Sequence, residues 1–386
     1  MKPVYILFII SIGLLTSCYK VYEPKVDKGQ NILVVNGMIT NRTEPYHILL
    51  SYADPFNSSG TPEPSSGANV YVSDDIGNNY SFHELKNGDY ISDSSQFTGQ
   101  PGQKYRLHIV TADGTEYGSA TQRLFPEVSP QSVNAEFNTK ITLNKYTGLK
   151  VTTSGADILA DIANSSDTIP QLRITSNMVM QYYYKISFPL SWDILLIFNY
   201  YCWVTVNSNA NINLTGVDYS VNSASIRKHP VCFLDNYFAV YAPRYDLKLN
   251  MADTTDVKNE TGYQNYDIHH RILYINLYTL NNDTYQYYKS LDAQIQSEGK
   301  LFDPIAAQLT GNIKCITDPN KKALGFFEAS SVNYSAYIVD FRNLSNSQPS
   351  LKRTPYILPP ELVGCVINRL GSPHQDHNIP GFWIFI

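Results

Sequence analysis

The chain of 386 residues has little charge. Asp, Glu, Lys and Arg together make up 16% of it, well below the quarter or so that is usual in globular proteins. The net charge is −5, and no stretch gathers Lys and Arg into a basic cluster. Because nucleic-acid binding needs such a cluster to meet the phosphates, we do not expect nucleic acid as a partner.

Catalytic and cofactor motifs are also missing. The sequence has no GxSxG, HExxH, Walker A, GxGxxG or EF-hand pattern, and its Cys and His residues form no CxxC or zinc-type spacing. We therefore expect no cofactor and no enzymatic activity. One weak alternative stays open, because His374, Asp376 and His377 lie close together between two prolines and could converge on a metal ion or serve an unrecognised hydrolase.

The first 18 residues combine a positive charge, an apolar run and a cysteine. Lys2 precedes an apolar run over residues 4–15, which is too short to span a membrane, since a spanning helix needs about 20 apolar residues. Residues 15–18 read Leu-Thr-Ser-Cys, the spacing of a bacterial lipobox, in which the cysteine is acylated before cleavage. We expect residues 1–17 to be a signal peptide, Cys18 to carry the lipid, and residues 18–30 to form a short tether.

Four further cysteines remain once Cys18 is assigned to lipid. An even number in an exported chain suggests disulfides, and three pairings of Cys202, Cys232, Cys315 and Cys365 are possible. Nearness in sequence favours Cys202 with Cys232 and Cys315 with Cys365.

Strand and turn residues dominate the rest. Tyr, Asn, Ser and Thr take the place of the missing charge, which is typical of β proteins. Over residues 31–126, short runs of alternating apolar and polar residues recur at intervals of about ten, separated by turn residues. This spacing predicts an N-terminal β-sandwich of the immunoglobulin-like or carboxypeptidase-regulatory-like type. The expected strands are centred on residues 32–37, 48–50, 68–72, 80–82, 90–92, 105–110 and 116–117.

A larger antiparallel β domain is expected over residues 127–386, because Pro126 and Pro130 interrupt the pattern before new alternating segments begin. One amphipathic helix is predicted near residues 284–298. Asn282 or Asp283 would cap it, and its apolar stripe would pack on a sheet. The fold class is therefore mainly β with one helix.

Aromatic residues are concentrated in the middle of this second domain. Alternation on a strand puts Tyr182 with Tyr184 on one face and Tyr201 with Trp203 on one face, and Trp192 lies between these pairs in sequence. Such rings could stack on a sugar or an aromatic peptide. They could equally be core residues covered by protein on both faces of the sheet.

Several segments together resemble a known family. They are residues 32–39 (ILVVNGMI), 67–70 (GANV), 88–90 (GDY), 101–107 (PGQKYRL), 111–117 (TADGTEY), 285–291 (YQYYKSL), 302–304 (FDP), 311–313 (GNI) and 324–327 (LGFF). In this order they are similar to the Bacteroidota lipoproteins grouped as domain of unknown function 4249. The resemblance implies an outer-membrane location beside TonB-dependent receptors, and it brings no catalytic residues.

The leading hypothesis is thus a lipoprotein held in the outer membrane by Cys18 that assists a TonB-dependent receptor in nutrient capture or uptake. The alternative is a free-standing adhesin or a glycan- or peptide-binding surface lipoprotein. Residues 19–23, which follow Cys18, contain a single acid, Glu23, and they leave open which side of the membrane the protein faces.

Overall fold

A computed structural model provides the fold. It describes residues 32–53, 62–144, 147–163, 170–191, 194–207, 212–216, 225–235, 267–296, 309–340 and 350–354. For 180–191, 194–207, 267–271, 350–354 and a few strand ends, only the backbone is described.

The described chain is mainly β with one helix, as the sequence predicts. The first eight strands are β1 (Leu33–Ile39), β2 (His47–Tyr52), β3 (Asn69–Asp74), β4 (Asn79–Lys86), β5 (Asp89–Ser92), β6 (Lys104–Val110), β7 (Glu116–Ser119) and β8 (Gln122–Arg123). The next seven are β9 (Pro130–Leu143), β10 (Lys150–Ala163), β11 (Gln171–Ser191), β12 (Ile194–Asn207), β13 (Asn213–Thr215), β14 (Ser225–Asp235) and β15 (Asp267–Leu280). After helix α3 (Asn282–Gln296) come β16 (Ile313–Cys315), β17 (Ala323–Ala329), β18 (Ser331–Asp340) and β19 (Ser350–Thr354).

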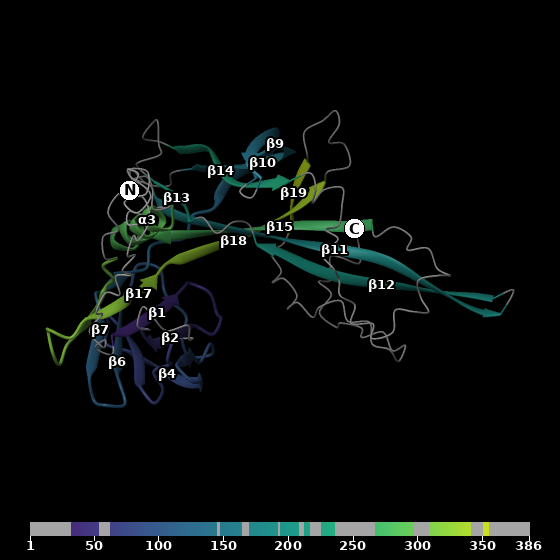
Figure 1. The fold of residues 1–386 in the computed structure, drawn as a ribbon. Helices are drawn as coiled ribbons and strands as arrows, with labels where there is room; N and C mark the ends of the chain where they lie inside the picture. Colours follow the sequence, from purple (N-terminus) through teal and green to yellow (C-terminus); the bar gives the residue numbers. More distant parts are fainter. Residues whose placement is uncertain are drawn as a thin grey trace, which may run out of the picture.

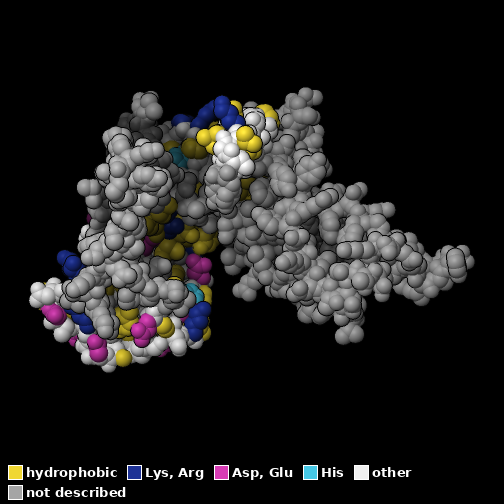
Figure 2. All heavy atoms as spheres, in the orientation of Figure 1, with side chains coloured by type: hydrophobic (Ala, Val, Ile, Leu, Met, Phe, Trp, Pro, Cys, Tyr) yellow, Lys and Arg dark blue, Asp and Glu magenta, His cyan; other side chains and the backbone are white. Residues whose placement is uncertain are grey.

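The first unit is built on one sheet with the order β16-β7-β6-β3-β4-β5-β2-β1-β17, and β8 pairs with β6. Its core follows the predicted alternation. In β6, for example, Tyr105, Leu107 and Ile109 are buried while the residues between them are more exposed. All seven strands expected in residues 31–126 are present. On the face of this unit that Figure 2 shows, acidic and basic side chains are interspersed.

The division of the chain at residue 126 is wrong in one respect, because two later strands complete the first sheet. β17 pairs in parallel with β1, and β16 pairs with β7, so that they form opposite ends of the strand order. The side chain of Asn312 joins these ends. Its Nδ2 donates to Phe327 O at 2.8 Å, and its Oδ1 accepts from Phe327 N at 2.8 Å. A boundary based on local prolines cannot anticipate strands that return from almost 200 residues later in the chain.

The second unit is a sandwich of two sheets. A three-stranded sheet, β14-β10-β9, packs on a six-stranded sheet, β12-β11-β15-β18-β19, in which β13 also pairs with β11. Their shared core includes Ile158 and Ile162 of β10, Ile174 of β11, and Leu273 and Ile275 of β15. β10 pairs with β9 on one side and with β14 on the other, and therefore forms the middle of the three-stranded sheet.

The two units share one continuous stretch of chain. Only Ser330 separates β17 in the first sheet from β18 in the second, and Figure 1 shows this stretch passing from one unit into the other. Near this crossing, Val332 N donates to Asn41 Oδ1 at 2.7 Å, and Arg42 Nε donates to Val332 O at 3.2 Å. Backbone and side chain therefore tie the units together.

Helix α3 lies where the two units meet (Figure 1). Its N-cap is Asn281 rather than Asn282 or Asp283, because Asn281 Oδ1 accepts from Thr284 N at 2.9 Å. Tyr285 is fully buried against Leu214 and Leu280, whereas Ile295 is 49% exposed, so only the N-terminal part of the predicted stripe packs. Among the described residues, no helix has the length and apolar character needed to cross a membrane.

Candidate ligand-binding pocket

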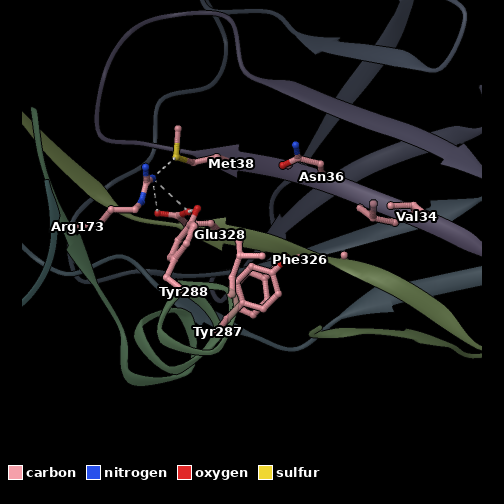
Figure 3. A pocket seen from close by; sticks show the side chains of 12 residues that line it. Val34, Asn36, Met38, Arg173, Tyr287, Tyr288, Phe326 and Glu328 are labelled. Atoms are coloured by element: carbon pink, nitrogen blue, oxygen red, sulfur yellow. Dashed lines mark hydrogen bonds and ion pairs between the residues drawn. The ribbon is translucent and has the colours of Figure 1, made fainter. Parts of the chain in front are cut away.

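A pocket lies at the junction of the two units. Its cavity volume is about 500 Å³, within the range usual for small-molecule sites. It is lined by the outer side of β1, by β17, by one face of α3 and by one residue of β11 (Figure 3). The lining residues are Val34, Val35, Asn36, Gly37, Met38, Arg173, Tyr287, Tyr288, Leu291, Gly325, Phe326 and Glu328.

One end of the pocket holds a buried ion pair. Arg173 Nη2 lies 3.3 Å from Glu328 Oε1 and 3.6 Å from Met38 Sδ, and the side chains of Arg173 and Glu328 are only 14% and 3% exposed. Tyr288 donates its hydroxyl to Glu328 Oε2 at 2.6 Å. Figure 3 shows these side chains converging from β11, β17, β1 and α3. The cluster thus joins every element that forms the pocket.

Aromatic rings flank the guanidinium of Arg173. Its Cζ lies 4.1 Å from the ring centroid of Tyr278 and 4.6 Å from that of Tyr288, which is the range of cation–π contacts. Arg173 Nε is buried and has no hydrogen-bond partner among the described residues. One donor at this end of the pocket is therefore left to be satisfied.

Burial and charge fix the protonation states of this cluster. Burial opposes the charged form of Arg173, but the Glu328 carboxylate outweighs it, and the pKa of Arg173 lies above its ordinary value. Burial, reinforced by the same carboxylate, raises the pKa of Tyr288 well above that of a free phenol. Arg173 is therefore a permanent cation, and Tyr288 remains a hydrogen-bond donor at all physiological pH values.

The other end of the pocket is aromatic and apolar. The rings of Tyr287 and Phe326 stack with centroids 4.4 Å apart and planes 26° apart, and Val34 and Leu291 are also among the apolar lining residues. Burial raises the pKa of Tyr287, so its hydroxyl is neutral. A ligand here would place an apolar or aromatic body against these rings.

Glycines allow the strands behind the pocket to approach closely. Gly325 has φ +95°, and a Cβ there would overlap the carbonyl oxygen of Val35. A Cβ at Gly311 would in turn overlap the carbonyl oxygen of Gly325. The glycines of the 311–313 and 324–327 segments are thus required by backbone contact.

The chemistry of the lining suits binding. It contains no Ser, Cys, His, Lys or Asp, and its one carboxylate, Glu328, is held by Arg173 and Tyr288. A nucleophile with an adjacent base is therefore missing from the lining. A simpler interpretation also exists, in which the Arg173–Glu328 pair only fastens β11 to β17, but it does not account for the adjacent cavity or for the stacked rings.

The aromatic residues predicted as ligand contacts lie elsewhere. Tyr182 and Tyr184 are in β11, and Tyr201 and Trp203 are in β12, while Trp192 lies outside the described residues. The ladder places Tyr182 opposite Cys202 and Tyr184 opposite Tyr200, whereas Tyr201 lies opposite Tyr183 and Trp203 opposite Gln181. Neither residue of the predicted pair in β11 is therefore opposite a residue of the predicted pair in β12. Their role as ligand contacts stays a prediction.

The cysteines and the metal candidates have different outcomes. In the described part of the chain, Cys232 of β14 and Cys315 of β16 are buried free thiols, so neither forms the disulfide predicted for it. They lie in different units, and nearness in sequence, which set the predicted pairs, does not decide which strands meet. Burial raises the pKa of Cys232 to about 11, which makes it an unreactive thiol. The side chain of Cys202, and residues Cys18 and Cys365, lie outside the described part.

The segment with His374, Asp376 and His377 also lies outside the described residues. Within the ranges that the structure describes, no three His, Cys, Asp or Glu side chains come close enough together to hold a metal ion.

Sequence reasoning missed the two charged residues of the pocket. Glu328 could have been found, because it is the last residue but one of an otherwise apolar strand, Ala323–Ala329, and a buried carboxylate in such a strand has to be paired. Its partner could not be found in this way, since Arg173 lies 155 residues earlier in the chain.

Comparison with known proteins gives the family of the chain. No curated protein and no solved structure matches it. A family model described as "Domain of unknown function (DUF4249)" matches residues 19–335, which is most of the chain and includes every lining residue of the pocket. The chain therefore belongs to the family described as domain of unknown function 4249.

Proposed function

We propose that this protein is a non-enzymatic lipoprotein of the outer membrane, anchored through Cys18, that binds a ligand in the pocket and assists a TonB-dependent receptor in nutrient capture or uptake. The observation that carries the binding role is the composition of the pocket. Three of the segments on which the family resemblance rests, residues 32–39, 285–291 and 324–327, supply ten of the twelve lining residues, and the other two are Arg173 and Glu328.

The segments are far apart in sequence and meet only in the folded chain. A family recognised by segments that line a cavity is more simply explained by a binding role there than by packing alone.

The anchoring part of the proposal is supported by the leader. The apolar run at 4–15 and the Leu-Thr-Ser-Cys spacing at 15–18 are those of an acylated lipoprotein. The tether does not decide which side of the membrane the protein faces. It contains only two acids, Glu23 within residues 19–23 and Asp27 further along residues 18–30.

The experiment is an affinity pull-down of the native lipoprotein from outer membranes in mild detergent, with mass spectrometry of the proteins that accompany it. We expect a TonB-dependent receptor in comparable amount. A Cys18→Ala variant, which cannot be acylated, is the control and should be released from the outer membrane without detergent. Recovery of the lipoprotein without a receptor, after crosslinking as well, would contradict the accessory role.

A second arm of the same experiment tests the pocket. Small molecules released by denaturing the purified protein are compared between the wild type and Leu291→Trp, which fills the cavity. Leu85→Trp, at an exposed position of β4, is the matched control. A compound that is present in the wild type and in Leu85→Trp but missing from Leu291→Trp would identify the ligand.

One observation favours the alternative of a free-standing glycan- or peptide-binding lipoprotein. β11 pairs with β15 only as far as Tyr183, but its pairing with β12 continues to Ser191. The aromatic-rich β11–β12 hairpin therefore extends beyond the rest of the sheet (Figure 1). If the pull-down yields no receptor, glycan and peptide arrays with Tyr182→Ala and Trp203→Ala variants become the next test.

A further inference from the structure

The β9–β10 hairpin carries an apolar face that leaves the core and continues into solvent. At its base, Ala135 and Ile158 pack in the core of the second unit. Further out on the same face of β9, Phe137, Ile141 and Leu143 are 51%, 66% and 67% exposed. The sheet core is thus prolonged by large side chains that no described element covers.

The pairing of strands explains why this end stands alone. β14 pairs with β10 only from Gly155 onward, so residues 150–154 of β10 pair with β9 alone. Leu149, at the turn, is 68% exposed, and Gly148 takes φ +66° to close it. The outer hairpin is therefore a two-stranded projection with an apolar tip, which by itself is costly to leave in water.

The positive charges near the tip of the hairpin favour an anionic partner. Residues 137–156 contain lysines but no Asp or Glu, in a protein whose net charge is −5. Lys150 is exposed and lies opposite Leu143 in the ladder, whereas Lys140 is on the polar face, 3.0 Å from Asp157. In Figure 2, apolar and basic side chains lie together at the top of the molecule, where Figure 1 places β9, β10 and β14.

We propose that the outer β9–β10 hairpin docks on an anionic lipid surface, with Ile141, Leu143 and Leu149 entering the interface and Lys150 meeting the headgroups. Apolar side chains beside basic ones give this type of peripheral binding. The inference rests on the proposed lipid anchor only for the nearness of the membrane. The tether of residues 18–30 spans at most about 45 Å when fully extended, so the anchor would keep the body close to that surface.

The test uses residues 19–386 made without the leader, which keeps every described residue but has no lipid. Co-sedimentation is measured with vesicles of phosphatidylglycerol and phosphatidylethanolamine. We expect the wild type to sediment with them and the Ile141→Ser/Leu143→Ser variant to lose more than about fivefold of the bound fraction. Lys150→Glu should weaken binding to these vesicles but not to vesicles of phosphatidylcholine alone.

The matched control is Ile76→Ser/Leu85→Ser, which removes two other exposed aliphatic side chains, from the first unit. It should bind as the wild type does. The proposal is overturned if the wild type stays in the supernatant, or if the hairpin variant binds normally. It is also overturned if the wild type is a dimer that the hairpin variant dissociates in sedimentation velocity, since the face would then join two copies.

Failure of the anchor is distinguishable from failure of this inference. If the N-terminal peptide of the mature wild type carries no acyl chain on Cys18 in mass spectrometry, the lipid anchor is refuted. Vesicle binding by residues 19–386 is measured without that anchor and stands or falls independently.

Discussion

At the scale of single residues, the Arg173–Glu328 pair is the most consequential contact of the pocket. Both side chains are largely buried, and each is held by more than one neighbour. Taking two charges out of water costs several kcal/mol each, and their mutual attraction offsets this only while both are present. The pair should therefore be more sensitive to the loss of one member than to the loss of both.

We predict that Arg173→Leu lowers the free energy of unfolding by about 3–5 kcal/mol, because it leaves Glu328 buried without a counter-charge. The double variant Arg173→Leu/Glu328→Leu should recover more than half of this loss. The measurement is the midpoint of urea unfolding followed by tyrosine fluorescence. Glu136→Gln, which breaks the exposed pair with Lys228, is the control and should leave the midpoint unchanged. An additive loss in the double variant would show that the pair is not coupled.

At the scale of elements, the capping of helix α3 connects the two units. Asn281 accepts from Thr284 N with its Oδ1, and its Nδ2 donates to Gln122 Oε1 at 2.6 Å. Gln122 belongs to β8 of the first unit, and Thr284 Oγ1 also donates to it, at 3.1 Å. The same side chain therefore starts the helix and fixes it to the other sheet.

We predict that Asn281→Ala destabilises the protein by about 1–2 kcal/mol through loss of the cap. It should also raise hydrogen exchange in the first turn of α3 and around Gln122, measured by mass spectrometry. Asp283→Ala, in the same turn, loses only a favourable charge near the helix N-terminus and should have a smaller effect. Equal effects of the two variants would contradict the assignment of Asn281 as the cap.

The sequence predicts an element well when the residues that form it are close together in the chain. In β6 the alternation of Tyr105, Leu107 and Ile109 is local, and the strand and its buried face are both as expected. The helix is also predicted from residues close together in the chain, but its N-cap, Asn281, lies one residue before the predicted candidates, Asn282 and Asp283. The pocket is formed by residues that are far apart in the chain, because Arg173 and Glu328 are separated by 155 residues. Hydrophobic periodicity and turn residues do not predict such a contact.

At the scale of the whole molecule, the first unit is completed by chain that follows the second. β16 and β17 supply both ends of the first strand order, and β17 then continues through Ser330 into β18. The order of elements along the chain is therefore not the order of units in space. Asn312 holds this arrangement closed, since its side chain takes the place of a neighbouring strand for Phe327.

We predict that Asn312→Leu, which fills similar volume but makes neither hydrogen bond, opens the seam between the two ends of the first sheet. The N–H and C=O of Phe327 would be left buried without partners, at a cost of about 1–3 kcal/mol each. Hydrogen exchange should rise at Phe327 and in β16, whereas amides in the β11–β15 ladder, which lies in the other unit, should change little. Asn312→Asp keeps the acceptor for Phe327 N but loses the donor to Phe327 O, and should fall between the wild type and Asn312→Leu. If Asn312→Leu instead raised exchange equally in both units, the first sheet would not be an independent structural unit, and the two units would have to unfold as one.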